Sequence, residues 1–453
     1  MARELRALSP TGALGHTPIE EESFREGLRR DPDFLGADAG SGDIGPYYLG
    51  TDTRYCAPEW EEFDLELMLT AARAKKVPLI IGSADGCGSN RAVDQLVETV
   101  RRIAERRNLS PFKLGYFYSE VDLDYLARRT RQESIRGLGA PAPLTLADVE
   151  ASSHVVAMSG VEPFQKLLED GAEVIIGGRS CDDAIFAAIP LMQGYPAGLA
   201  YHLGKVLECA SMSATPLMLH ETMIGTIRDD CVLLEPMHPI QRATRESVAG
   251  HSLYERTHPY YQAMPGGVLD MTGTVYEQYS ERTVRLHGSV FTPSSPYCVK
   301  LEGAGQAGHR HLAIVGLRDP FALAKLDEII EGIRTFIAKK YPNTDDYQLY
   351  FHIYGKDGVM GVLEPTPEIR SHEVCIVVEA VGKTPALSKV IATMGYFRFF
   401  AARYEGQKQN AGGAALLNDQ VLYTGPACRW TVDHLLPLSS PLELFPTKVV
   451  TVG

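Results

Sequence analysis

The chain has 453 residues, of which 45% are apolar and 22% charged, a size and composition that predict a globular protein of two or three domains. Its formal net charge of −13 excludes nucleic acid as the main partner, because phosphate binding needs a basic surface. A small anionic substrate remains compatible with this charge, since a single arginine can govern a pocket.

The cysteines and the N-terminus bear on the compartment. Eight cysteines are scattered without CxxC spacing, so neither a zinc ribbon nor a thioredoxin-type site is expected. Scattered cysteines in a long chain are typical of a reducing compartment. The N-terminus lacks the apolar stretch of a secretory signal, and no segment reaches the ~20 apolar residues that span a bilayer. We therefore expect a cytoplasmic protein without a membrane partner.

Alternating elements are expected after a segment rich in Gly, Pro and Asp over residues 1–60. Helices are predicted at 60–76, 91–107, 122–132, 161–170 and 182–192. Strands are predicted at 77–81, 113–117, 154–158 and 173–177. Apolar strands that alternate with helices predict a parallel sheet covered on both faces, with right-handed crossovers.

The pattern changes after about residue 225. Strands are predicted at 268–275, 283–291, 297–302, 311–316, 347–354 and 373–380, helices at 320–340 and 384–395, and a strand, a loop and a strand over 423–453. Strands and helices in separate clusters predict an α+β domain. We therefore expect an α/β protein with a parallel-sheet domain over 1–235 and a second, α+β domain over 236–453.

The most informative segment is residues 173–187, in which a short apolar strand runs into a glycine turn and then into Arg179, Asp182 and Asp183. In open α/β proteins, strands that feed helix N-termini bind anionic ligands. An arginine can grip a carboxylate at two points, and paired aspartates can move a proton or hold a metal. The alternative is structural: Ser180 to Asp183 fits a variant of the capping box, and acidic residues favour the first turn of a helix.

The loop over residues 36–45 is rich in glycine, so its backbone can approach a ligand closely. Asp38, Ser41 and Asp43 are its candidate substrate contacts. The loop is not a dinucleotide fingerprint, because no clear strand precedes it and its aspartates would repel a pyrophosphate. The alternative is a solvated loop of tight turns.

The loop over residues 83–90 joins a strand of the buried type to a helix. It therefore lies at the strand end where open sheets bind ligands. Ser83, Asp85, Ser89 and Asn90 are its candidate substrate contacts. Ser89 or Asn90 is also a natural helix N-cap.

Further candidates lie near and beyond the change of pattern. Glu221 is a candidate catalytic base, and Arg242 is a second candidate for binding a substrate carboxylate. Lys356 can reach a carboxylate from a turn that also fits a plain hairpin. No HExxH or Walker motif is present, so ATP use is not expected and no cofactor is predicted, while a divalent metal remains open.

Several short motifs together carry a resemblance to a known family. They include Gly-Arg-Ser-Cys-Asp-Asp-Ala at 178–184 and Tyr-Gly-Lys-Asp-Gly-Val-Met-Gly at 354–361. The others lie at 245–248, 253–255, 259–260, 270–272, 302–304, 316–320 and 410–412. With these residues the chain resembles, over nearly its whole length, the acyclic terpene utilisation A proteins, a bacterial catabolic family.

Two candidate ligand loops depart from the family pattern. Residues 239–243 read Pro-Ile-Gln-Arg-Ala where the family often has a Gly-Thr-Gly-Gly turn, and residues 411–415 read Ala-Gly-Gly-Ala-Ala in place of Ala-Gly-Asn-Leu-Ala. The substrate can therefore differ from that of typical members. The resemblance implies a catabolic role on branched or unsaturated carboxylic acids or their thioesters, with a small companion protein in some members. It supplies no settled catalytic residues.

The residues themselves favour a lyase, either a hydratase or a dehydratase, that acts on a small di- or polycarboxylate. In this hypothesis Arg179 and Arg242 hold substrate carboxylates, and Asp182 or Asp183 removes or returns a proton. Backbone amides of the loops at 36–45 and 83–90 stabilise the enolate-like charge.

Two alternatives stay open. The first is a non-catalytic substrate-binding subunit of a two-component enzyme. The second is a metal-dependent isomerase or hydrolase that uses Asp43, Asp85 and Asp182. A homo-oligomer is expected on general grounds, because closed symmetric assemblies are common among soluble proteins.

Overall fold

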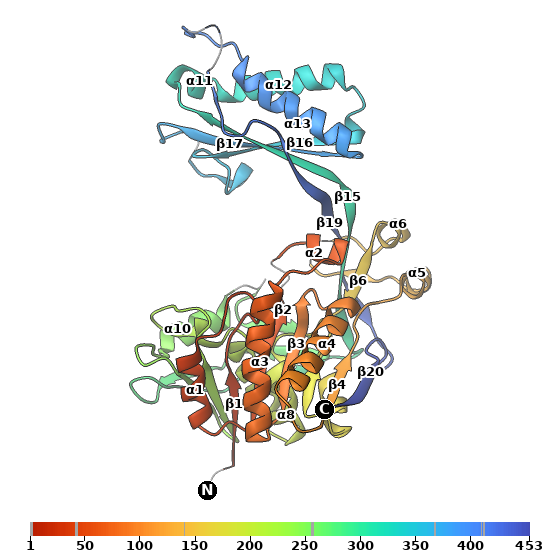
Figure 1. The fold of residues 1–453 in the computed structure, drawn as a ribbon, viewed down its shortest axis with the longest axis vertical. Helices are drawn as coiled ribbons and strands as arrows, with labels where there is room; N and C mark the ends of the chain where they lie inside the picture. Colours follow the sequence, from red (N-terminus) through yellow and green to blue (C-terminus); the bar gives the residue numbers. More distant parts are fainter. Residues whose placement is uncertain are drawn as a thin grey trace. The chain divides into compact units, whose positions relative to one another are not determined.

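The computed structural model describes residues 3–40, 44–139, 141–254, 258–366, 368–408, 410 and 413–453, and these fall into two compact units (Figure 1). The first unit consists of Met1–Gly305 and Trp430–Gly453, and the second of Gln306–Arg429. The boundary expected at residue 235 falls inside the main sheet of the first unit, because β9 (Val232–Pro236) is one of its strands.

A mixed sheet forms the centre of the first unit. Within the described residues it has ten strands in the order β12-β13-β9-β8-β1-β2-β3-β7-β4-β20. The parallel neighbours at its centre are β1 (Glu4–Ser9), β2 (Phe34–Gly40), β3 (Leu79–Gly86), β7 (Val174–Ile176) and β4 (Phe112–Phe117). The antiparallel flanks are β8 (Met223–Arg228), β9, β13 (Val284–His287), β12 (Val275–Gln278) and β20 (Thr447–Val452). The expected parallel sheet is thus confirmed at the centre, whereas the sheet as a whole is mixed.

Helices cover both faces of this sheet, as the apolar strands predicted. Neighbouring side chains on β3 point to opposite faces, so Ile81 packs with α3 (Pro58–Lys75) and α4 (Asn90–Arg106). Ile80 packs instead with the core that contains α7 (Glu162–Glu169), α8 (Ala184–Met192) and α9 (Ala197–Leu207). All eight residues of β3 are buried, which agrees with a strand covered on both faces.

Three helices, α3, α4 and α8, begin at or near residues for which the sequence offers a start signal. Pro58 is the first residue of α3, a position where its missing N–H costs nothing. The side chain of Ser89 accepts from the backbone N of Ala92 and caps α4, as predicted. The capping alternative for α8 is wrong, because that helix begins only at Ala184 and Asp183 makes no side-chain cap.

The strand expected at 154–158 is present as β6 (His154–Ala157) but lies outside the parallel sheet. It pairs antiparallel with β15 (Cys298–Leu317), which joins the two strands expected at 297–302 and 311–316 into one. A smaller antiparallel sheet contains β10 (Tyr261–Met264), β11 (Gly267–Asp270) and β14 (Val290–Pro293). Alternation with helices therefore predicted the strand but not its partner.

The second unit is an antiparallel sheet with two helices against it (Figure 1). β16 (Tyr347–Tyr354) pairs with β17 (Val374–Gly382), which pairs with the later part of β15. α12 (Leu326–Lys340) and α13 (Pro385–Phe400) bury apolar residues against these strands, among them Ile333 and Ile391. The strands and helices expected between 311 and 395 are confirmed.

Further helices and strands complete the two units. They are α1 (Glu21–Arg29), α2 (Tyr47–Thr51), α5 (Leu123–Gln132), α6 (Leu146–Glu150), α10 (Arg245–Leu253), α11 (Pro320–Ala324), β5 (Arg136–Gly137), β18 (Ala415–Leu416) and β19 (Leu422–Pro437). Among the helices of the described ranges, none combines the length and apolar character that crossing a bilayer requires.

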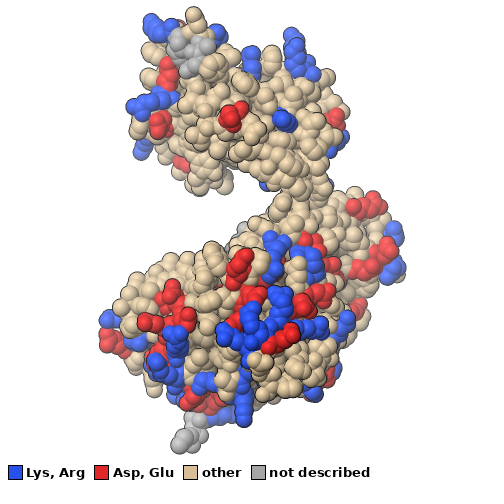
Figure 2. Space-filling view, viewed as in Figure 1, with Lys and Arg blue, Asp and Glu red and all other residues tan. Residues whose placement is uncertain are grey.

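Acidic and basic side chains are mixed on the face that carries α3 and α4 (Figure 2). Glu62 on α3 pairs with Arg102 and Arg106 on α4, with N···O distances of 2.9 and 2.6 Å. Exposed pairs of this kind contribute at most about 1 kcal/mol each. The buried charges at the carboxyl ends of the parallel strands are more informative about function.

Candidate functional site

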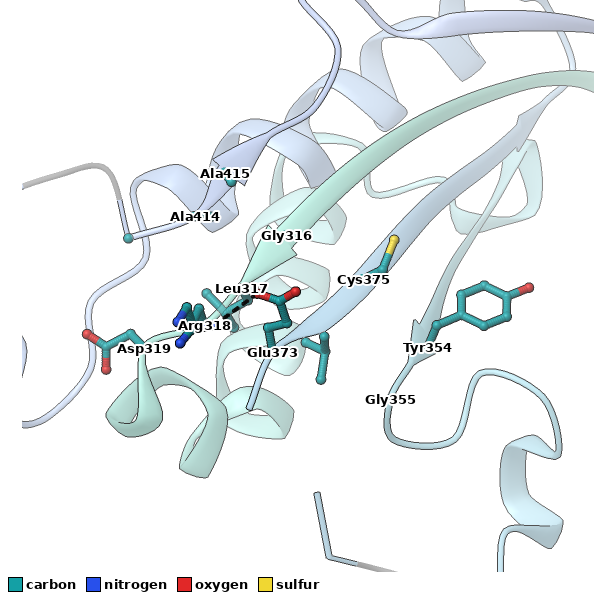
Figure 3. Close-up of a pocket in the computed structure, with 12 residues that line it drawn as sticks. Gly316, Leu317, Arg318, Asp319, Tyr354, Gly355, Glu373, Cys375, Ala414 and Ala415 are labelled. Atoms are coloured by element: carbon teal, nitrogen blue, oxygen red, sulfur yellow. Dashed lines mark hydrogen bonds and ion pairs between the residues drawn. The ribbon is translucent and has the colours of Figure 1, made fainter. Parts of the chain in front are cut away.

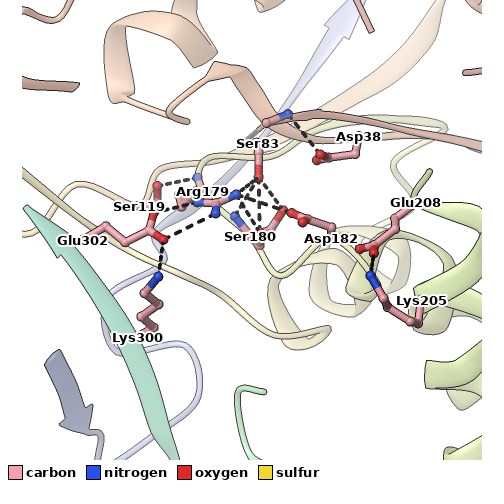
Figure 4. A network of polar contacts seen from close by, with 11 residues as sticks. Asp38, Ser83, Ser119, Arg179, Ser180, Asp182, Lys205, Glu208, Lys300 and Glu302 are labelled. Carbon is pink, nitrogen blue, oxygen red and sulfur yellow. Dashed lines mark hydrogen bonds and ion pairs between the residues drawn. The ribbon is translucent and has the colours of Figure 1, made fainter. Parts of the chain in front are cut away.

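A cluster of polar side chains lies at the carboxyl ends of the parallel strands. Asp38 belongs to the end of β2, Ser83 to the end of β3, and Ser119 and Arg179 follow β4 and β7 (Figure 4). Parallel strands end at the same edge of a sheet, so these side chains meet although they are far apart in the sequence. Asp38, Ser83 and Arg179, three of the residues predicted to contact a ligand, therefore lie together at this edge.

Two serines hold the turn that carries Arg179. The backbone N of Arg179 donates to Oγ of Ser119 over 2.6 Å, and the backbone N of Ser180 donates to Oγ of Ser83 over 3.2 Å. Ser83 has a φ of 49°, a left-handed conformation that is uncommon for residues other than glycine. Gly88 is required here, because a Cβ on it would lie 2.2 Å from the backbone N of Arg179. Such local strain is found most often at functional sites.

The guanidinium of Arg179 is buried, with 4% of the residue exposed, and is held mainly by Glu302. Its Nε donates to Oε2 of Glu302 over 2.8 Å, and its Nη2 donates to Oε1 over 3.4 Å. Its Nη1 makes only longer contacts, including 3.2 Å to Ser83 Oγ and 3.4 Å to Asp182 Oδ1. Although burial opposes its charge, Glu302 and Asp182 raise the pKa of Arg179, which keeps it cationic.

Glu302 also belongs to the cluster, although it was not predicted from the sequence. Lys300 Nζ donates to its Oε1 over 2.8 Å, so Glu302 lies between two cations. Burial raises the pKa of Glu302, but Arg179 and Lys300 outweigh it and lower the pKa to about 2. Glu302 falls within a family motif at 302–304, which was the one available signal, yet it is 123 residues from Arg179.

The opposite side of Arg179 is rich in acid (Figure 4). Asp38 is 4% exposed; its Oδ2 accepts from the backbone N of Gly40 over 3.2 Å, and its Oδ1 has no hydrogen-bond partner among the described residues. Burial and the charge of Asp182 raise the pKa of Asp38 well above its ordinary value. Burial also raises the pKa of Asp182, against Arg179 and Lys205, and 35% of the Asp182 side chain remains exposed.

Lys205 and Glu208 complete this side of the cluster from α9. The two side chains form an ion pair in which Lys205 Nζ donates to Glu208 Oε1. Burial raises the pKa of Glu208 to about 8, although Lys205 opposes the shift. Neither residue was a sequence candidate, because no helix was predicted at 197–207. A Lys and a Glu three residues apart, within an otherwise apolar segment, were the signal.

Four predicted residues lie near the cluster but are used in other contacts. Asp183 Oδ2 accepts from Gln262 over 3.1 Å, and Asp85 Oδ1 accepts from the backbone of Tyr55 and Cys56. Ser89 caps α4 and also donates to Asp52 over 2.7 Å. Asn90 exchanges hydrogen bonds with Glu120. These contacts shape the edge of the sheet around Arg179.

The other predicted residues lie apart from the contacts of Arg179. Ser41 and Asp43 lie outside the described residues. Glu221 is buried near His238, whose Nε2 is 3.9 Å from Glu221 Oε1. Arg242 is largely exposed and pairs with Glu281 over 2.9 Å. Lys356 belongs to the second unit, where it pairs with Asp327.

Two pockets are relevant to these residues. One, of about 480 Å³, is lined by Lys300, Glu302 and Asp433 together with Trp430 and His434, so Glu302 connects it to Arg179. The other, of about 730 Å³, lies in the second unit (Figure 3). Its lining residues come from the motif segments 316–320 and 354–361 and from 373–375 and 413–415. Motifs that are separate in the sequence thus meet at one pocket.

Fold and site define a mixed α/β protein with a buried charged cluster at the carboxyl ends of its parallel strands. Residues 51–411 match the family model described as acyclic terpene utilisation family protein AtuA, and the chain belongs to that family. Membership implies a catabolic role in the utilisation of acyclic terpenes. Neither a curated protein nor a solved structure matches the chain.

Proposed function

We propose that the chain is a hydro-lyase, a hydratase or dehydratase, that acts on a small branched or unsaturated carboxylic acid or its thioester. The observation that carries this proposal is the pair of neighbouring carboxyl groups of Asp38 and Asp182, both with a raised pKa, at the carboxyl ends of parallel strands. A raised pKa brings a carboxyl group closer to neutral pH, which suits it to general acid–base catalysis. Family membership supports a small catabolic substrate.

In the dehydration direction, Asp182 removes a proton from the carbon next to the carboxylate or thioester. Asp38 in its protonated form donates its proton to the hydroxyl on the neighbouring carbon. The C–H and C–O bonds break, the C=C bond forms, and water leaves. The proton on Asp182 then returns to Asp38, which restores both groups. The exposure of 35% of the Asp182 side chain gives a substrate access to this step.

Arg179 has a binding and a positioning role in this proposal. Glu302 holds Nε and Nη2, which fixes the plane of the guanidinium. Nη1, whose contacts are 3.2–3.5 Å long, is the nitrogen left to bind a substrate carboxylate in that plane. A cation at that point also stabilises the enolate-like charge that builds up during proton removal.

The proposal is tested with the purified full chain and a panel of branched hydroxy and unsaturated carboxylic acids and their thioesters. Turnover is followed by the absorbance of the conjugated double bond and by NMR. We expect turnover of at least one compound and its loss in Asp182→Asn. The matched control is Asp124→Asn, an exposed aspartate on α5. Full activity in Asp182→Asn would exclude this assignment of the base.

A second candidate function is that of a substrate-binding subunit that works with a small companion protein. The second unit favours it with a run of exposed apolar side chains that includes Val359 (85% exposed), Val362 (101%) and Leu363 (75%). A contiguous exposed apolar surface marks an interaction site. Binding of a compound from the panel without turnover by the isolated chain would support this function over the lyase.

A further inference from the structure

A second group of ionisable side chains lies beside the carboxyl end of β3, separate from the contacts of Arg179. Cys56, Glu61 and Asp85 each offer one ligand atom within 4.8 Å of the others. All three are buried, with 5%, 0% and 1% of their surfaces exposed. A thiol and two carboxyl groups shielded from water in this way need a compensating partner, because burying charge is costly.

Each carboxylate in the group is held through one oxygen and leaves the other without a partner. Asp85 Oδ1 accepts from the backbone N of Tyr55 over 3.0 Å and of Cys56 over 2.8 Å, and Glu61 Oε2 pairs with Arg54. Asp85 Oδ2 and Glu61 Oε1 are buried and have no hydrogen-bond partner among the described residues. Metal-binding carboxylates show this division, with one oxygen oriented by an outer contact and the other on the ion.

The Cys56 thiol donates to the backbone O of Leu14 over 3.5 Å. A divalent ion at the centre of the group would take the place of the thiol proton and give both unpartnered carboxylate oxygens a ligand bond.

We propose that Cys56, Glu61 and Asp85 bind a zinc-type divalent metal ion. A thiolate with two carboxylate oxygens suits zinc, whereas magnesium and calcium prefer oxygen ligands alone. Atoms bound to one zinc ion at about 2.0–2.3 Å lie within about 4.5 Å of each other. A small inward movement of these side chains therefore brings all three onto one ion. The site is independent of the hydro-lyase proposal.

The loop that carries Gly15 closes over the thiol. Asp64 on α3 accepts from the backbone N of Gly15 over 3.1 Å and of Ile19 over 2.8 Å, which holds this loop in place. A Cβ on Gly15 would lie 3.1 Å from Cys56 Sγ and 3.1 Å from Glu61 Cβ. The backbone therefore packs directly against two of the three ligands, and the site is enclosed rather than open at the surface.

The test is metal analysis and cobalt titration of the full chain purified without chelator. We expect one zinc ion per chain. After removal of the metal, cobalt should produce a thiolate-to-cobalt charge-transfer band, which zinc then abolishes. Cys56→Ser should lose the band, and Asp85→Asn should weaken cobalt binding at least ~10-fold. The controls are Cys87→Ser, a nearby buried cysteine outside the group, and Glu62→Gln, the helical neighbour of Glu61.

A measurement on the unaltered chain covers the case in which Cys56→Ser does not fold. Bound zinc should slow alkylation of Cys56 and leave that of Cys87 unchanged, as mapped by mass spectrometry. The proposal is overturned by a wild-type chain that gives no cobalt band, by a band that persists in Cys56→Ser, or by zinc that leaves the alkylation of Cys56 unchanged.

Discussion

Carboxyl groups lie on two sides of Arg179, and their pKa values are shifted in opposite directions. On one side, Glu302 lies between Arg179 and Lys300, and its pKa falls to about 2. On the other side, burial raises the pKa of Asp38, Asp182 and Glu208. The difference lies in the balance of charge. Two cations stabilise the ionised form of Glu302, whereas neighbouring carboxyl groups disfavour one another's ionised forms. We therefore assign a structural role to the first side and chemistry to the second.

The largest expected effect tests the acidic side. Asp38→Asn should lower turnover at least ~100-fold, because an amide cannot donate and regain the proton. The free energy of unfolding should change by less than ~1 kcal/mol, since Oδ1 has no partner to lose and the amide oxygen of asparagine can keep the hydrogen bond from the backbone N of Gly40. Kinetics and urea denaturation of the same preparation measure both. A variant that is destabilised but fully active would reverse the assignment of roles.

The next effect tests the structural side. Glu302→Gln should lower the free energy of unfolding by about 3 kcal/mol, because it leaves the buried guanidinium of Arg179 without its main anion. The control is Glu281→Gln, which breaks the exposed pair with Arg242 and should cost less than ~1 kcal/mol. Equal costs in the two variants would show that burial adds nothing to the Glu302 pairs.

The two sides should also respond to pH with opposite sign. Glu302 has a lowered pKa, so its contribution to stability is complete above its ordinary value of 4.5 and is lost as the pH falls toward about 2. Glu208 has a pKa raised to about 8, so the folded state binds the extra proton and stability falls as the pH rises from 4.5 toward about 8.

Denaturant unfolding across this range measures both contributions. In a plot of the free energy of unfolding against pH, Glu302→Gln should reduce only the slope below pH 4.5, and Glu208→Gln only the slope above it. If neither slope changed, the result would contradict the balance of charge around Arg179.

The smallest effect gives the scale of a helix cap in the same region. Ser89→Ala removes the side-chain cap of α4 and the hydrogen bond to Asp52, and should cost about 1–2 kcal/mol of unfolding free energy. Ser89→Gly also loses the hydrogen bond to Asp52 but should cost less than Ser89→Ala, because glycine is itself a good N-cap. If Ser89→Ala cost as much as Glu302→Gln, charge would not distinguish the Glu302 pairs from an ordinary hydrogen bond.

Local patterns in the sequence were sufficient for much of the fold. The apolar runs of β3 and β7 and the polar loops after them predicted parallel strands with ligand chemistry at their ends, and Ser89 predicted the start of α4. These signals work because periodicity, capping and turns involve residues that are close in the chain. The placement of Arg179 and Asp182 at that edge follows from the same strand–turn–helix pattern.

Packing between distant segments decided the rest. β6 was predicted as a strand, but its pairing with β15 rather than the parallel sheet depends on residues more than a hundred positions away. The anion that holds Arg179, and the meeting of Cys56 with Asp85, likewise come from separate segments. By itself the sequence determined many of the elements, though not β1, β2 or α9, and the edge at which polar groups gather. Only the tertiary structure decided which charges neutralise each other, because burial and long-range proximity set the pKa of each group.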